Sequence, residues 1–60
     1  SGKLIDMLFE KGLVNSRSEA RRLIVQGAVY VDGRKVFDVY EVVPKDSIVK
    51  VGKRRYLKST

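Results

Sequence analysis

The spacing of apolar residues divides the chain into a helical first half and a β-rich second half. Apolar side chains recur at helical intervals over residues 3–11, which predicts a short amphipathic helix. A second helix is predicted over about residues 16–26, where Ala20, Leu23 and Ile24 form an inward stripe. Two helices joined by a short loop make an αα-hairpin.

Capping residues support the bounds of both helices. Ser16 can cap the second helix, and Glu19 can reach back to complete a capping box. Gly12 and Gly27 each follow a helix, at the position where the chain often turns left-handed. These local signals agree with the apolar pattern, which is typical of a specified structure.

The second half changes to the period of strands. Residues 28–31 and 34–37 are predicted to be the arms of a hairpin, because the Asp32-Gly33 pair between them is a strong two-residue turn signal. Residues 38–46 are rich in polar residues and predict a connecting loop.

A second hairpin is expected at the end of the chain. Residues 48–51 are mostly β-branched and predict a third strand. The Gly52-Lys53 pair fits a two-residue type II′ turn, and residues 54–58 return as a fourth strand. The predicted fold class is α+β, with a two-helix hairpin packed on a small, mainly antiparallel four-stranded sheet.

Several apolar and aromatic residues lie outside these stripes. Phe9 and Phe37 are expected in the core, and Val42 with Val43 is expected to anchor the connecting loop to it. Tyr30 and Tyr56 could stack on bases. Because tyrosine is common in strands as a packing residue, packing is the favoured interpretation for both.

Composition argues against a self-contained active site. The chain has 60 residues, which is the size of one domain, here residues 1–60. It contains no Cys and no His. The usual metal ligands and the usual acid–base group are therefore missing, and we expect no catalytic residue, no metal and no cofactor. The lack of Cys also fits a reducing cytoplasm.

The charge balance indicates a polyanionic partner. The net charge is +6 and the pI is about 10.0. Such a basic domain is expected to bind nucleic acid or an anionic membrane surface, although a merely solvated charged surface stays possible. Membrane binding is disfavoured because there is no apolar run of spanning length and no strongly amphipathic basic helix.

The second helix carries the main candidates for nucleic-acid contact. Arg17, Arg21 and Arg22 lie on or beside its outer face, and Gln26 could add a hydrogen bond to a sugar or a base. Arginine can clamp a phosphate with two parallel hydrogen bonds. The alternative is that acids such as Glu19 neutralise these arginines in surface pairs, which contribute little stability.

The two hairpins supply further candidates. Arg34 and Lys35 follow the first turn, and Lys53, Arg54 and Arg55 crowd the second. Adjacent cations repel one another, and an anionic partner relieves that repulsion. The alternative is that basic residues on an edge strand protect against aggregation.

The motif at the centre of the chain resembles a known family. It reads Ser16-Arg17-x-x-Ala20-x-x-Leu23-Ile24-x-x-Gly27-x-Val29-x-Val31-Asp32-Gly33. This spacing is similar to the signature of the alpha-L RNA-binding domain, named after ribosomal small-subunit protein S-four. The resemblance covers nearly the whole chain and implies structured RNA as the partner. It differs at Asp32, where the family more often has Asn, and both residues suit the turn.

Flanking residues indicate the subfamily. The segments at residues 12–14, 27–31 and 52–57 are similar to those of bacterial tyrosyl-tRNA synthetases. This resemblance implies a C-terminal piece of a larger cytoplasmic ligase that grips tRNA(Tyr) beside the catalytic domain of its parent. Alternatives are the same domain from a ribosomal protein, a pseudouridine synthase or a ribosome-associated heat-shock protein, or a basic module that docks on an acidic protein.

Overall fold

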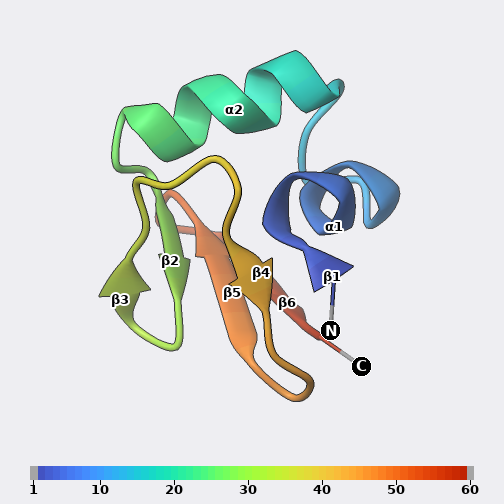
Figure 1. Ribbon diagram of the computed structural model, residues 1–60, viewed down its shortest axis with the longest axis vertical. Coiled ribbons are helices and arrows are strands. Elements are labelled where there is room, and N and C mark those ends of the chain that lie inside the picture. The colour runs from blue at the N-terminus through green and yellow to red at the C-terminus, as the bar shows by residue number, and fades with distance from the viewer. Residues whose placement is uncertain (1, 60) are drawn as a thin grey trace.

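A computed structural model describes residues 2–59, which form two helices and six short strands (Figure 1). In chain order the elements are β1 (Gly2–Lys3), α1 (Leu4–Glu10), α2 (Arg17–Val25), β2 (Val29–Val31), β3 (Arg34–Lys35), β4 (Val42–Val43), β5 (Ile48–Val51) and β6 (Arg55–Lys58).

The main sheet has four antiparallel strands in the order β3-β2-β5-β6. The predicted fold class is therefore confirmed. The first hairpin has the predicted two-residue turn, because Val31 pairs with Arg34. Asp32 and Gly33 have φ angles of 53° and 82°, as a turn with two left-handed residues requires. The Asp32 carboxylate also accepts a hydrogen bond from the Ile48 amide at 2.9 Å, which ties the turn to β5.

The start of α2 follows the predicted capping pattern. The Ser16 hydroxyl accepts a hydrogen bond from the Glu19 amide at 3.1 Å. Glu19 reaches back as expected, but its carboxylate accepts from the amide of Asn15, one residue before the cap, at 2.6 Å. Gly27 follows the helix with a φ of 79°. A side chain thus satisfies one amide in the first turn of the helix, and another satisfies the amide just before the cap.

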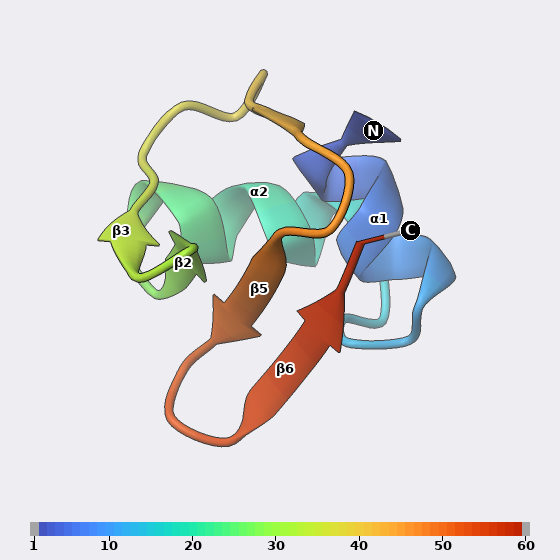
Figure 2. The ribbon, with the colours of Figure 1, turned by 90° about the horizontal axis from the view of Figure 1, so that it is seen from below.

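The core lies between the helices and one face of the main sheet. In Figure 2, which is turned by 90°, both helices lie behind β5 and β6. The buried apolar residues come from both helices, the loop between them, β2, β4, β5 and the segment after β3. They are Leu4, Leu8, Val14, Ala20, Ile24, Val29, Val31, Val36, Val43, Val49 and Val51.

Three apolar expectations were wrong. Phe9 is 38% exposed and Phe37 is 61% exposed, so neither belongs to the core. Val42 is more than half exposed, and only Val43 anchors the loop. In a domain this small, most large side chains have at least one face in solvent, because little volume lies far from the surface.

Two connections also differ from the expectation. Val42–Val43 is a strand, and it pairs with Gly2–Lys3 in a second, two-stranded sheet. The turn between β5 and β6 contains three residues instead of two, because Val51 pairs with Arg55. Gly52 begins it with a φ of 64°, so the predicted need for glycine there holds although the turn length was wrong.

Candidate nucleic-acid interface

The outer face of α2 presents two arginines that no acid neutralises. A shallow hollow of about 450 Å³ lies on this face, and Arg21 and Arg22 border it together with Ser18, Val25 and Gln26. All five residues are exposed. Among residues 2–59 the only ion pairs are Arg17–Asp6 and Arg34–Glu41. The guanidinium groups of Arg21 and Arg22 are therefore available to an anion. We call these five residues the α2 surface.

Arg17 is held against α1. Its Nε donates to the Asp6 carboxylate at 2.9 Å, and its guanidinium carbon lies 4.6 Å from the centre of the Phe9 ring. Arg17 and Asp6 are each about half exposed, so the pair is partly screened by water. The structure thus gives Arg17 a role in joining the two helices, and its charge is less available than those of Arg21 and Arg22.

Lys35 connects the first hairpin to the end of α2. Its Cδ would lie 3.2 Å from a Cβ built on Gly27, so its stem crosses the backbone just after the helix. Only a residue without a side chain leaves this approach open. The charge of Arg34 is less available to an anion, because its guanidinium donates to the Glu41 carboxylate at 2.9 Å.

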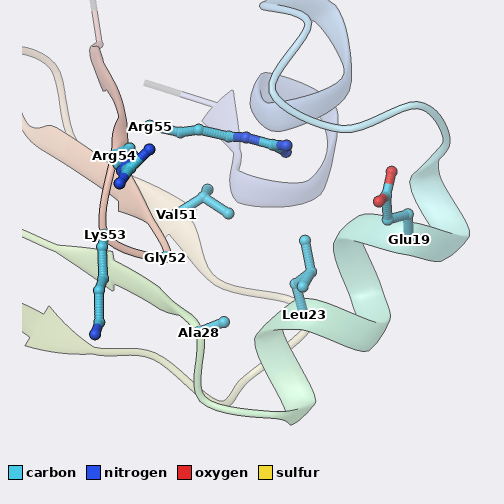
Figure 3. A pocket seen from close by; sticks show the side chains of 8 residues that line it. All are labelled: Glu19, Leu23, Ala28, Val51, Gly52, Lys53, Arg54 and Arg55. Carbon is cyan, nitrogen blue, oxygen red and sulfur yellow. The ribbon is translucent and has the colours of Figure 1, made fainter.

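The three cations of the second hairpin do not form one patch. Arg55 donates to the backbone carbonyl of Leu13 at 2.7 Å. Figure 3 shows Arg55 stretching across a hollow of about 430 Å³ that Leu23 enters from α2, while Lys53 points away from it. Arg55 therefore bridges the sheet and the loop that joins the helices. Of the three cations, only Lys53 and Arg54 extend from the turn.

Lys50, a basic residue of the sheet, was not singled out in the sequence analysis. Lys50 lies between Tyr30 and Tyr56, and its Nζ is 5.7 Å and 5.6 Å from the centres of their rings. Tyr56 is 58% exposed, which contradicts the favoured packing interpretation for that residue. The signal was present in the alternation of residues 48–51, because buried Val49 and Val51 place Lys50 on the opposite face.

The part of the chain that the structure describes holds no group of three or more acidic, His or Cys side chains that could bind a metal ion. Within residues 2–59, neither helix has the length and apolarity needed to cross a membrane.

Comparison with known proteins shows the family of the chain. The S4 domain family matches residues 3–49. The tyrosine–tRNA ligase of Thermotoga maritima is 42% identical over 55 residues, which cover 88% of this chain and 14% of that protein. The tyrosine–tRNA ligase of Dehalococcoides mccartyi strain CBDB1 is 46% identical over 56 residues, covering 93% of the chain and 14% of that protein. That of Carboxydothermus hydrogenoformans is 47% identical over 68 aligned positions, covering 95% and 16%.

The chain thus spans about one seventh of the length of these relatives. The family match covers both helices, the first hairpin and the following segment up to the middle of β5. The α2 surface and Lys35 all fall inside it, whereas the β5–β6 turn and β6 do not. On these matches, the chain belongs to the S4 domain family of RNA-binding domains.

Proposed function

We infer that this chain binds structured RNA through the α2 surface and Lys35. The single observation that carries the proposal is the pair Arg21 and Arg22, which are exposed on a capped helix and lie in no ion pair among residues 2–59. Each guanidinium can donate two parallel hydrogen bonds to one phosphate. Both side chains start from the same rigid helix. Their guanidinium groups therefore meet the phosphates of a structured RNA from positions that the helix keeps fixed.

Recognition of this kind follows the shape of the RNA. The major groove of an A-form helix is too deep and narrow for side chains to read, so phosphates and sugars supply most contacts. Gln26 is the C-cap of α2, directly before the glycine that the Lys35 stem approaches, and it can hydrogen-bond to a sugar. If about five phosphates are neutralised, the logarithm of the binding constant should fall with log salt at a slope of roughly −3.5 to −4.5.

The proposed RNA is tRNA(Tyr), and the proposed parent is a tyrosine–tRNA ligase. The names of the relatives and their identity to this chain support this assignment. In such a parent, this chain would be the C-terminal RNA-binding piece, and the remaining residues would hold the catalytic domain. The chain itself would hold the tRNA, notably near its long variable arm, and perform no chemical step.

The test compares transfer RNAs on the isolated chain by chemical-shift titration. We expect tRNA(Tyr) with a long variable arm to bind more tightly than a tRNA without one, and to shift the amides of α2. Equal affinity for both would contradict the assignment to tRNA(Tyr). Salt-sensitive binding to an acidic protein, with no binding to any RNA, would instead identify a protein-docking module.

A double variant then tests the surface itself. Arg21→Glu with Arg22→Glu should abolish RNA binding and leave the circular dichroism spectrum unchanged, because neither side chain supports the fold. Lys45→Glu, at an exposed cation on the loop between β4 and β5, is a control for charge reversal away from α2. Unchanged affinity of the double variant would exclude the α2 surface.

A further inference from the structure

The outer face of the main sheet carries one row of alternating lysines and tyrosines. Lys35 of β3 pairs with Tyr30 of β2, Tyr30 pairs with Lys50 of β5, and Lys50 pairs with Tyr56 of β6. The row therefore crosses all four strands without a gap. Directly opposed residues share one face of a sheet, so these four side chains lie side by side. We call them the Lys–Tyr row.

Distances within the row show that the side chains are in contact range. The Nζ of Lys35 lies 5.8 Å from the centre of the Tyr30 ring. The Nζ of Lys50 lies within 5.7 Å of both ring centres, so one ammonium group serves two rings. Tyr30 and Tyr56 also border one shallow hollow of about 400 Å³, with Lys50 between them.

This face is basic and has no helix over it. The neighbouring row on β5 and β6 consists of Ile48 and Lys58, which pair with each other and are exposed. The six side chains of the two rows include three lysines, and the Asp32 carboxylate, which accepts a hydrogen bond from the Ile48 amide, lies at their edge. Both helices pack on the opposite face (Figure 2). A surface of this charge is complementary to a polyanion.

We propose that the Lys–Tyr row binds unpaired nucleotides of an RNA strand, with bases stacked on Tyr30 and Tyr56 and a phosphate between them held by Lys50. Exposed aromatic rings on a four-stranded sheet stack bases in other RNA-binding folds, so the geometry is a known physical solution for single strands. Here it lies on the face opposite to the helices.

Ring spacing selects an unstacked strand. Tyr30 and Tyr56 lie on strands that are two steps apart in the sheet, and at about 4.8 Å per step their backbones are roughly 10 Å apart. Successive nucleotides of one strand rise only about 3.4 Å along the axis of a DNA duplex, and their bases are stacked on one another at a similarly small spacing in any regular double helix. Two neighbouring bases of a regular helix therefore cannot reach both rings, whereas a splayed strand can.

Relative magnitudes favour displacement of the lysine by a base. An exposed cation–π contact changes an equilibrium by about two- to five-fold. Stacking of a base on an aromatic side chain changes affinity by about 5- to 150-fold. A base can thus replace the Lys50 ammonium above a ring, and the displaced ammonium remains close enough to pair with the phosphate.

The proposed role of the row extends the proposed RNA-binding function. It rests on that function in one respect, namely that a single RNA would supply both the paired and the unpaired segments. The row shares Lys35 with the proposed RNA-binding site, but it shares no residue with the α2 surface itself. The two tyrosine rings lie on β2 and β6, whereas Arg21 and Arg22 lie on α2. Their contributions can therefore be measured separately with two probes.

The test measures binding of a labelled hexauridylate and of a fully paired RNA hairpin to the whole chain. Uridines stack weakly on one another, so their bases are free to stack on the protein. Tyr30→Leu with Tyr56→Leu should weaken hexauridylate binding at least tenfold and change hairpin binding less than twofold. Tyr30→Phe with Tyr56→Phe keeps both rings and should bind within about threefold of the natural chain.

Matched controls separate stacking from folding and from nonspecific charge. Tyr40 is 81% exposed and lies on the loop before β4, so Tyr40→Leu should leave hexauridylate binding unchanged. The chain has no Trp and three Tyr, so a Tyr40→Phe variant also reports stacking through quenching of its two remaining tyrosines. If the double leucine variant loses its circular dichroism spectrum, Tyr56→Leu alone provides the test, because that side chain is already in solvent.

Each outcome decides the proposal. Loss in the leucine variant with retention in the phenylalanine variant supports it. Equal binding by the leucine variant, or no hexauridylate binding by the natural chain, overturns it. If hexauridylate does not bind while the hairpin binds and is lost with Arg21→Glu and Arg22→Glu, the row fails and the proposed function stands. If hexauridylate binding depends on the rings and the hairpin does not bind, the row stands and the α2 surface fails.

Discussion

Two groups of three basic residues carry the same charge but differ in how the fold holds them. The first is Arg17, Arg21 and Arg22 on α2, and the second is Lys53, Arg54 and Arg55 at the β5–β6 turn. In each triplet, one arginine makes a contact within the fold. Arg17 joins α2 to α1 through Asp6 and Phe9, and Arg55 joins β6 to the carbonyl of Leu13.

The remaining cations differ in what fixes them. Arg21 and Arg22 project from a helix whose start is capped by a side chain and whose end is closed by backbone hydrogen bonds. Lys53 and Arg54 project from a three-residue turn that begins at Gly52. Ordering a side chain on an unsupported turn costs more conformational entropy on binding than using one whose backbone is already fixed. Local charge is thus a weak guide to a binding surface unless the backbone that carries it is rigid.

The largest expected effect separates the two triplets by RNA affinity. Arg21→Gln with Arg22→Gln should weaken binding to an RNA hairpin about 100-fold, because each removes a charge-assisted hydrogen bond worth about 1.5 kcal/mol. The salt slope should become shallower by about 1.5, as two phosphate contacts are lost. Lys53→Gln with Arg54→Gln should weaken binding only about threefold. Fluorescence anisotropy at several salt concentrations measures the affinity and the salt slope of each variant. Equal losses of affinity in the two variants would contradict the idea that backbone rigidity decides which cations bind RNA.

The next effect compares the glycines at the base of the two regions. Gly27 and Gly52 both have positive φ angles, of 79° and 64°. A Cβ at Gly27 would lie 3.0 Å from the Phe37 ring and 3.2 Å from the Lys35 stem, whereas a Cβ at Gly52 meets nothing within 4 Å. Gly27→Ala should therefore cost about 2 kcal/mol of unfolding free energy and Gly52→Ala about 1 kcal/mol.

Thermal unfolding distinguishes the two alanine variants. At about 4–8 °C per kcal/mol for a domain of this size, Gly27→Ala should lower the Tm by roughly 8–16 °C and Gly52→Ala by about half as much. Gly27→Ala should also displace Lys35 from the end of α2 and weaken RNA binding. A larger loss of stability at Gly52 would mean that close contact at the helix end does not matter.

The smallest effect concerns the cap that fixes the α2 surface. Ser16→Ala removes the acceptor for the Glu19 amide and should cost about 1 kcal/mol. Ser18→Ala is the matched control, because Ser18 is an exposed helical residue and alanine is the better helix former. Ser16→Ala should lower the Tm by several degrees while Ser18→Ala leaves it unchanged or slightly higher. An unaltered Tm for Ser16→Ala would place the start of α2 elsewhere.

Sequence alone predicted the features that depend on neighbours along the chain. The Ser16 cap, the left-handed Gly27 and the Asp32-Gly33 turn each involve residues at most a few positions apart, so local rules suffice. The inward stripe of α2 followed from its helical period. The spacing of the motif at residues 16–33, and hence the family, was readable for the same reason, whereas β1 and β4 were not predicted.

Only the tertiary structure decided which side chains meet across the chain. The Arg17–Asp6 pair, the Arg55–Leu13 bond and the Lys–Tyr row join residues that are separated by 5 to 42 positions. Periodicity states which residues share a face of one element, but it does not state what covers that face. In a 60-residue domain few faces can be covered. Which aromatic rings and which cations were left in solvent was therefore settled by packing, and those exposed groups are the ones available to a partner.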